Sequence, residues 1–224
     1  SLYPTEHALG QWDDDWQNFS AISFAFAYDL AKELKIPIGI VNCAFSTTQI
    51  QAWVPREGFA GAEDKYTQAI YKRILESDLQ GPEFEKAWDA YYQSLRDWAK
   101  ECAELVKKKL PVTRPPAAPG KLRGNRDISW MYNGKIHPMV PYAIRGGIWN
   151  QGYANQNEGV VYRNNLHSLV RGWRKVWGKP DMPVYFHQFY CPGRTADDGI
   201  TLNDPAEMRL GTWCASKEIP NAAM

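Results

Sequence analysis

Small hydroxyl and amide side chains follow three short segments whose apolar pattern predicts strands. They lie at residues 43–48, 149–155 and 188–190. Such side chains donate hydrogen bonds without ionising near neutral pH, so they suit a reaction in which negative charge develops on a carbonyl oxygen. In an open parallel sheet the ligand site lies at the carboxyl ends of the strands. We therefore expect the functional site at that edge.

A complete nucleophile and base cannot be assigned from residue types alone. Ser46 follows a predicted strand and is the best-placed hydroxyl, while His137, His167 and His187 are the imidazoles that could serve it. His187 falls inside a predicted strand, where a hydrogen-bonded core histidine is expected, and His167 falls on the surface of a predicted helix. His137 precedes a proline in a loop and is the least constrained. Structural roles are favoured for all three.

No pattern in the sequence predicts a metal site. The acidic clusters at 13–15 and 197–198 are expected to be solvated. Asn18 opens a formal glycosylation pattern, but it falls where we expect a helix cap. The four cysteines have neither metal-ligand nor disulfide-framework spacing, and they are Cys43, Cys102, Cys191 and Cys214.

Charge and composition argue against several classes of function. The 224 residues include 26 basic and 25 acidic side chains, so no electrostatic footprint favours nucleic acid or an anionic membrane. No apolar run approaches the length of a bilayer span, and the first residues lack the pattern of a secretory signal. The 10 Trp and 12 Tyr suit core packing, and also stacking on sugar rings.

The first half of the chain predicts two helices and a strand. Apolar residues recur at helical spacing over 18–35, with Asn18 or Ser20 as the cap, and 36–45 is an apolar run typical of a buried strand. Helical spacing returns over 82–109, which predicts the longest helix. Its aromatic stripe is interpreted as core, with a partner surface as the alternative. The residues of the stripe are Trp88, Tyr91, Tyr92 and Trp98.

The second half alternates predicted strands and helices. After an exposed Pro- and Gly-rich segment, strands are predicted at 142–151 and 182–190, and helices at 160–177 and 204–216. This alternation predicts an α/β fold, a three-layer α/β/α sandwich with a mainly parallel sheet. We expect one domain over 1–224, incomplete in this chain, with a helical insertion at about 61–110 and a loop at about 111–126.

Three stretches, in order, resemble blocks of the sialate O-acetylesterases and related carbohydrate acetylesterases of the SGNH-hydrolase superfamily. The first, FSAISFAFAYDLAKELKIPIGIVNCAFSTTQIQAW, is similar to the family's FSA helix, its strand, its GGT turn and a tryptophan, here Trp53. The second, YNGKIHPMVPYAIRGGIWNQGYAN, is similar to the blocks YNGMI-x-PL-x-PYAIRG and W-x-QGESN. The third, YRNNLHSLVRGWRKVWGKPDMPVYFHQF, is similar to a helix with a Trp-Arg pair and a strand that ends in glutamine.

The resemblance implies a flavodoxin-like sheet and serine-hydrolase chemistry without a metal or organic cofactor. It places the side-chain amide of Gln151 in the oxyanion hole, together with backbone amides at the turn of Ser46 and Thr47. We assign substrate-binding roles to Trp53, Tyr153 and Asn155. The resemblance also implies an acetylated glycan as substrate, and a secreted or periplasmic location.

The sequence departs from the family where catalysis is concerned. No GQSN-like nucleophile motif and no Asp-x-x-His pair occur in these 224 residues. Ser46-Thr47-Thr48 replaces the GGT turn, which reduces the freedom to adopt positive φ. Tyr153 stands where the family has a glutamate, so whatever that glutamate orients needs another partner.

Two functions follow as hypotheses. The first is a carbohydrate O-acetylesterase whose serine and Asp-His pair come from missing segments or a second polypeptide. The alternative is a non-catalytic relative that binds glycan without cleaving it. The sequence does not fix the natural ester, its regiochemistry or the oligomeric state.

Overall fold

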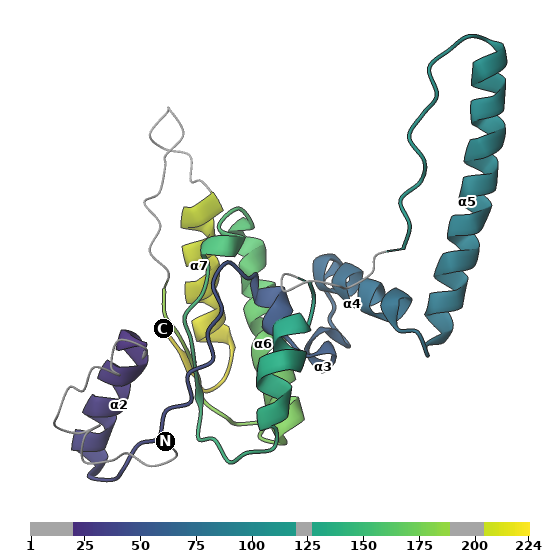
Figure 1. Cartoon of the computed structure of the whole chain (residues 1–224). Helices are drawn as coiled ribbons and strands as arrows, with labels where there is room; N and C mark the ends of the chain where they lie inside the picture. The colour runs from purple at the N-terminus through teal and green to yellow at the C-terminus, as the bar shows by residue number, and fades with distance from the viewer. Residues whose placement is uncertain (1–19, 120–126, 189–203) are drawn as a thin grey trace, which may run out of the picture. The chain divides into compact units, whose positions relative to one another are not determined.

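The computed structural model describes residues 20–119, 127–188 and 204–224 (Figure 1). By the pattern of contacts the chain forms two compact units, Ser1–Ser46 and Thr47–Met224. Each unit is described by itself. The predicted single-domain organisation stays a prediction.

The described part of the first unit contains one helix, α2 (Ala21–Leu34). Ser20 caps it, because its hydroxyl accepts a hydrogen bond from the Ser23 amide at 3.4 Å. The helix ends at Lys35, whose φ of 54° is left-handed. The predicted helix and its cap are therefore confirmed.

The strand predicted at 36–45 is not found. This segment has no regular structure, and Ile36 and Val41 are more than half exposed. A buried strand needs neighbours that pair with its backbone and cover its side chains. The segment belongs to the first unit, whereas the sheet belongs to the second.

The second unit contains a parallel sheet in the order β1-β2-β3. Its strands are β1 (Gly147–Trp149), β2 (Val184–Phe186) and β3 (Ala222–Ala223). Trp149 pairs with Phe186, and Val184 pairs with Ala222. Helix α6 (Tyr162–Trp177) connects β1 to β2, and α7 (Asp204–Glu218) leads into β3. The predicted α/β fold with a parallel sheet is confirmed.

Helix α6 contributes several large side chains to the core. It is amphipathic, and it buries Leu166 and Leu169 completely and Trp173 almost completely. The Trp173 ring packs edge to face on Trp149 of β1 at 5.9 Å, and its indole N–H donates to the Trp53 carbonyl. Burial of these large apolar surfaces is the main force that fixes the helix on the sheet.

Two glycines allow α6 to approach the short helix α3 (Arg56–Phe59) closely. A Cβ on Gly172 would lie 2.6 Å from Pro55 Cγ and 2.9 Å from the Cα of Gly58. Arg171 adds two hydrogen bonds from its guanidinium to the Gly58 carbonyl. Backbone therefore packs on backbone at this crossing.

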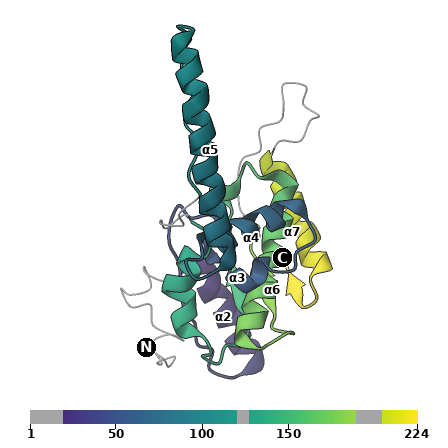
Figure 2. The same cartoon turned by 90° about the vertical axis from the view of Figure 1, so that its right-hand side faces the viewer.

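Two further helices, α4 (Lys65–Ser77) and α5 (Pro82–Lys107), follow α3. Asp64 caps α4 by accepting a hydrogen bond from the Thr67 amide at 2.8 Å. Helix α5 has 26 residues and is the longest described helix, as predicted. Residues 110–119 have no helix or strand and run back along α5 (Figure 1), where the Trp98 indole donates to the Thr113 carbonyl. Figure 2 shows that only the start of α5 lies near α4.

The core interpretation of the α5 aromatic stripe is wrong. No residue of α5 is buried, and Tyr92 is 49% exposed. A helical stripe becomes core only where another element covers it, and α5 meets α4 only near its start. The rings of Phe84, Trp88, Tyr91 and Tyr92 instead pack on one another at centroid distances of 5.7 to 6.0 Å.

Substitution of Gly172 by alanine should lower the free energy of unfolding by about 1 to 3 kcal/mol, because the added methyl meets backbone and proline ring, which cannot move aside. Urea unfolding followed by circular dichroism measures the change. Gly134→Ala is the matched control, since a Cβ there has no neighbour within 4 Å. Equal stability of both variants would contradict the close helix crossing.

Candidate functional site

Gln151 lies directly beyond the carboxyl end of β1, at the edge where the sequence placed the site. Its Nε2 donates to the Thr48 carbonyl at 2.9 Å and to Asn155 Oδ1 at 2.8 Å. Its Oε1 accepts from the Tyr162 hydroxyl at 2.9 Å. The Thr48 carbonyl can only accept a hydrogen bond, so the NH2 group must lie on its side, and this fixes the orientation of the amide.

Thr48, which follows the residues expected to supply backbone amides, contacts the Gln151 side chain through its carbonyl. Thr48 is buried and its hydroxyl accepts from the Trp53 indole at 2.8 Å. Thr47 is exposed and adopts a left-handed φ of 61°. The turn thus keeps the conformation that glycine favours, although a β-branched residue occupies it, at a cost of roughly 1 to 2 kcal/mol. Ser46 is exposed and ends the first unit.

Asn155 connects Gln151 to a larger polar network. It ends the 3-10 helix η5 (Tyr153–Asn155) and is 1% exposed. Its Oδ1 accepts from the Ile50 amide at 3.0 Å, and its Nδ2 donates to Gln51 Oε1 at 3.0 Å and to Glu158 Oε1 at 2.8 Å. All four hydrogen-bonding positions of the amide side chain are used, which explains how it tolerates complete burial.

The Glu158 carboxylate is the centre of this network. Four side chains donate to it, from Gln51 in η2 (Ile50–Trp53), Tyr66 in α4, Asn155 in η5 and Asn165 in α6. Three of the four distances are 2.8 Å. Three of these donors share Oε1, and Asn165 donates to Oε2, so both carboxylate oxygens accept hydrogen bonds from the protein. One side chain therefore ties together four segments around the carboxyl end of β1.

Tyr162 forms the other support of Gln151. Its hydroxyl receives a hydrogen bond from the Trp149 indole at 3.0 Å and donates to Gln151. Burial is the main cause that raises the pKa of Tyr162 far above its usual value, and the negative charge of Glu158 adds to it. Burial also raises the pKa of Tyr66. Both phenols are held in the protonated form, which the donated hydrogen bonds require.

The structure places the predicted site residues at very different depths. Trp53 and Asn155 are buried, Tyr153 is 71% exposed, and Gln151 is half-buried. Their catalytic and substrate-binding roles stay predictions. Trp53 packs edge to face on Trp149 at 6.0 Å and so holds the turn beside Gln151.

Sequence reasoning missed the supporting residues of the network. Gln51, Tyr66, Glu158 and Asn165 were not singled out. The signal was the density of amides in QIQAW and NQGYANQNE, because buried amides need partners. Tyr153 stands where the family has a glutamate, and Glu158 supplies a carboxylate five residues later.

The three imidazoles do not form a site with Gln151. His137 is exposed and lies 3.3 Å from the Tyr132 hydroxyl through Nδ1, and His167 contacts Glu218 at 3.0 Å. His187 is exposed just after β2, so its expected place in the core is wrong. The strand ends at Phe186, whereas the apolar pattern predicted a strand over 182–190. The two acidic clusters and Asn18 lie outside the described residues.

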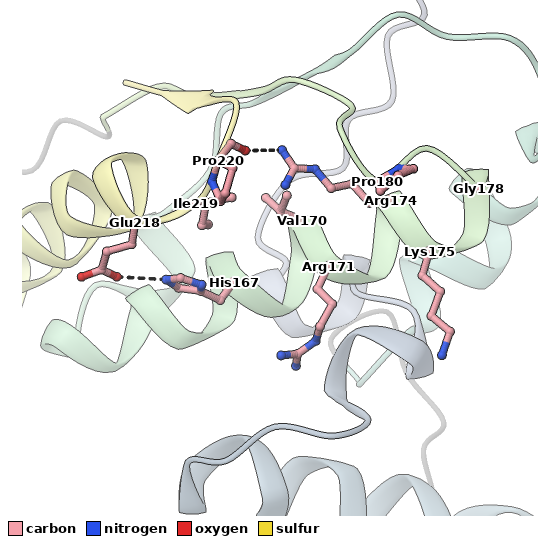
Figure 3. A pocket seen from close by; sticks show the side chains of 10 residues that line it. All are labelled: His167, Val170, Arg171, Arg174, Lys175, Gly178, Pro180, Glu218, Ile219 and Pro220. Carbon is pink, nitrogen blue, oxygen red and sulfur yellow. Dashed lines mark hydrogen bonds and ion pairs between the residues drawn. The ribbon is translucent and has the colours of Figure 1, made fainter.

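Figure 3 shows a pocket of about 560 Å³ at the amino ends of β2 and β3, and thus at the opposite edge of the sheet from Gln151. Arg174 points to the Pro220 carbonyl, whereas Arg171 points away toward α3. His167 is paired with Glu218. The two guanidinium groups therefore point in different directions and do not form a single anion-binding site.

Among residues 20–119, 127–188 and 204–224, no group of three or more metal-ligating side chains is found. Within the same ranges, no helix is both long and apolar enough to cross a bilayer. Among the described residues, Cys102 and Cys214 form no disulfide bond.

Comparisons with known proteins agree with the sequence blocks. The chain is 24% identical over 176 residues to a sialate O-acetylesterase of Rattus norvegicus, a match that covers 78% of this chain and 28% of the relative. It resembles the crystal structure of a carbohydrate acetylesterase from Xanthomonas citri with a TM-score of 0.54 and 19% identity, over 92% of this chain and 34% of the other. No family model matches. The chain thus spans about a third or less of the length of these proteins.

The two comparisons bear on different parts of the prediction. The sequence match confirms the resemblance to the sialate O-acetylesterases, and the structural match confirms the α/β fold.

Replacement of Glu158 by glutamine should destabilise the second unit by about 2 kcal/mol or more, because the new NH2 group would face donors instead of accepting from them. Urea unfolding measures the loss. Glu83→Gln is the control, since Glu83 forms an exposed pair with Lys86 on the surface of α5. A loss of stability in Glu158→Gln no larger than that in Glu83→Gln would contradict the central role of Glu158 in the network.

The ionisation of Tyr162 should contribute to the pH dependence of the free energy of unfolding. In the unfolded chain its phenol ionises at about pH 10, whereas the folded protein keeps it protonated. The contribution of Tyr162 to stability is therefore complete below that pH and falls as the pH rises above it. The free energy of unfolding, measured from about pH 8 to 11, should fall less steeply in Tyr162→Phe. The same change at exposed Tyr92, whose hydroxyl is not part of the network, should leave the slope unchanged.

Proposed function

We propose that this chain is the part of a carbohydrate O-acetylesterase that builds the oxyanion hole. The observation that carries the proposal is the position of the Gln151 amide, 2.9 Å from the carbonyl of the turn that contains Thr47 and Thr48. This contact supports the proposal that the Gln151 amide and a backbone amide of the turn act together as donors of an oxyanion hole. The substrate is an acetylated glycan, as in the proteins to which the chain is similar by sequence and fold.

In the reaction, a serine hydroxyl attacks the acetyl carbonyl, a histidine takes its proton, and the carbonyl oxygen becomes an oxyanion. The protonated histidine returns the proton to the sugar hydroxyl as it leaves. Water then attacks the acetyl-enzyme by the same steps and releases acetate. No GQSN-like or Asp-x-x-His motif occurs in these 224 residues. The serine, aspartate and histidine accordingly come from sequence outside this stretch.

Gln151 stabilises the oxyanion by sharing its amide hydrogen. In the resting protein both Nε2 hydrogens are donated to protein oxygens, one of them the Thr48 carbonyl. A charged oxygen is a stronger acceptor than a neutral carbonyl, so an oxyanion that forms beside the Thr48 carbonyl shares this hydrogen in a bifurcated bond. Tyr162 and Asn155 hold the amide in place, which avoids reorganisation at that moment.

The test is hydrolysis of 4-nitrophenyl acetate and of acetylated xylan by the natural-length protein that carries this sequence. Gln151→Ala should lower kcat by roughly 10² to 10³, the usual cost of one lost oxyanion donor. Gln151→Glu keeps the size of the side chain but cannot donate from its carboxylate, and should lose as much.

Gln93→Ala, on the exposed face of α5, is the control and should keep wild-type activity. Thermal unfolding of each variant separates loss of folding from loss of chemistry. Full activity of a folded Gln151→Ala variant would overturn the oxyanion assignment. Absence of acetate release by the wild-type protein would overturn the esterase itself.

A further inference from the structure

A second cavity, of about 680 Å³, lies between the end of α4, the start of α5 and residues 128–137. Its base is apolar, because Ile74 and Ile128 are buried there. Aromatic side chains line its walls, namely Phe84 and Trp88 from α5 and Trp130 and Tyr132 from the other side. The volume and the aromatic walls are those of a small-molecule site.

Trp130 is presented to this cavity by a strained residue. Ser129 is buried yet has a φ of 61°, which is unfavourable for a residue with a Cβ. Its amide donates to the Gln51 carbonyl at 3.0 Å and its hydroxyl donates to the Val54 carbonyl at 2.7 Å. These two bonds fix the conformation, and the next residue, Trp130, is left 45% exposed. Strain of this kind persists where the surrounding structure enforces it, often at ligand sites.

Trp88 forms part of the opposite wall and is also held in place. Its ring lies edge to face against Tyr91 at 5.7 Å and tilted against Phe84 at 6.0 Å. Helix α5 buries none of its residues, so these aromatic rings are not required for a core. Flat, ordered, partly exposed indole rings are suited to contact the apolar face of a sugar.

The carboxylates that line the cavity outnumber the guanidinium groups. Three carboxylates line it, those of Glu57, Glu76 and Asp78, against one guanidinium, that of Arg56, which pairs with Asp78 at 3.1 Å. Burial raises the pKa of Tyr132, and the charge of Glu57 adds to the effect. Carboxylates accept hydrogen bonds from hydroxyl groups, but they repel an anionic ligand.

We propose that this cavity binds an uncharged sugar chain, with Trp130 and Trp88 as stacking faces and Glu57 and Asp78 as acceptors for sugar hydroxyls. This proposal rests on the proposed function, which gives a glycan as the class of substrate, and it narrows that class to uncharged glycans. A glycan with acidic sugars is disfavoured here by the three carboxylates. The cavity thus selects neutral glycans.

Isothermal titration calorimetry with two linear oligosaccharides tests this inference. Xylotetraose is the neutral probe and tetragalacturonate is the anionic one, and neither carries an acetyl ester. The wild-type protein should bind xylotetraose at least about tenfold more tightly than tetragalacturonate, which corresponds to about 1.4 kcal/mol. Failure of ester hydrolysis would leave this result untouched, because the assay involves no turnover.

Two variants locate the binding. Trp130→Ala should weaken xylotetraose binding about tenfold or more, and Trp130→Phe should restore part of it because a flat ring remains. Trp213→Ala is the matched control, since Trp213 is 49% exposed on α7 and does not line the cavity. Absence of xylotetraose binding, equal or tighter binding of tetragalacturonate, or wild-type affinity in Trp130→Ala would each overturn the proposal.

Discussion

The arrangement around Gln151 depends on one carboxylate that has been taken partly out of water and must therefore be satisfied by the protein. Glu158 accepts hydrogen bonds from Gln51, Tyr66, Asn155 and Asn165, which come from four separate elements. Each of these donors would lose its partner if its element moved away. Since an unpaired buried polar group costs about 1 to 3 kcal/mol, the network makes the positions of those elements depend on one another.

This dependence explains how a rigid donor can be built from loops. Asn155 transmits the position of Glu158 to Gln151, and Tyr162 holds the other end of the Gln151 amide. Trp149 supplies both the core contact with α6 and the indole hydrogen bond to Tyr162. Apolar packing therefore places the helix and the strand, and the polar network then sets the orientation of the side chain at their edge. Neither contribution is sufficient alone, because packing is not directional and hydrogen bonds are weak where water competes.

The turn beside Gln151 shows the limits of reasoning from residue types. Loss of the glycines predicted reduced access to positive φ, yet Thr47 adopts a φ of 61°. The buried Thr48, bonded to the Trp53 indole, holds the turn, so tertiary contacts offset a local preference of about 1 to 2 kcal/mol. Ser129 repeats the pattern beside the second cavity, where two hydrogen bonds enforce a similar conformation.

The sequence by itself determined the helices at 21–34, 82–107 and 162–177, the parallel strands at 147–149 and 184–186, and the edge of the sheet at which Gln151 lies. These features follow from local apolar periodicity and from the geometry of parallel sheets, which the order of residues encodes directly. Tertiary structure decided that 36–45 is not a strand, that the α5 aromatic stripe is not core, and that Glu158 gathers donors from 51 to 165. Burial and hydrogen-bond partners are properties of which segments meet, and periodicity within one segment carries no information about the segment that covers it.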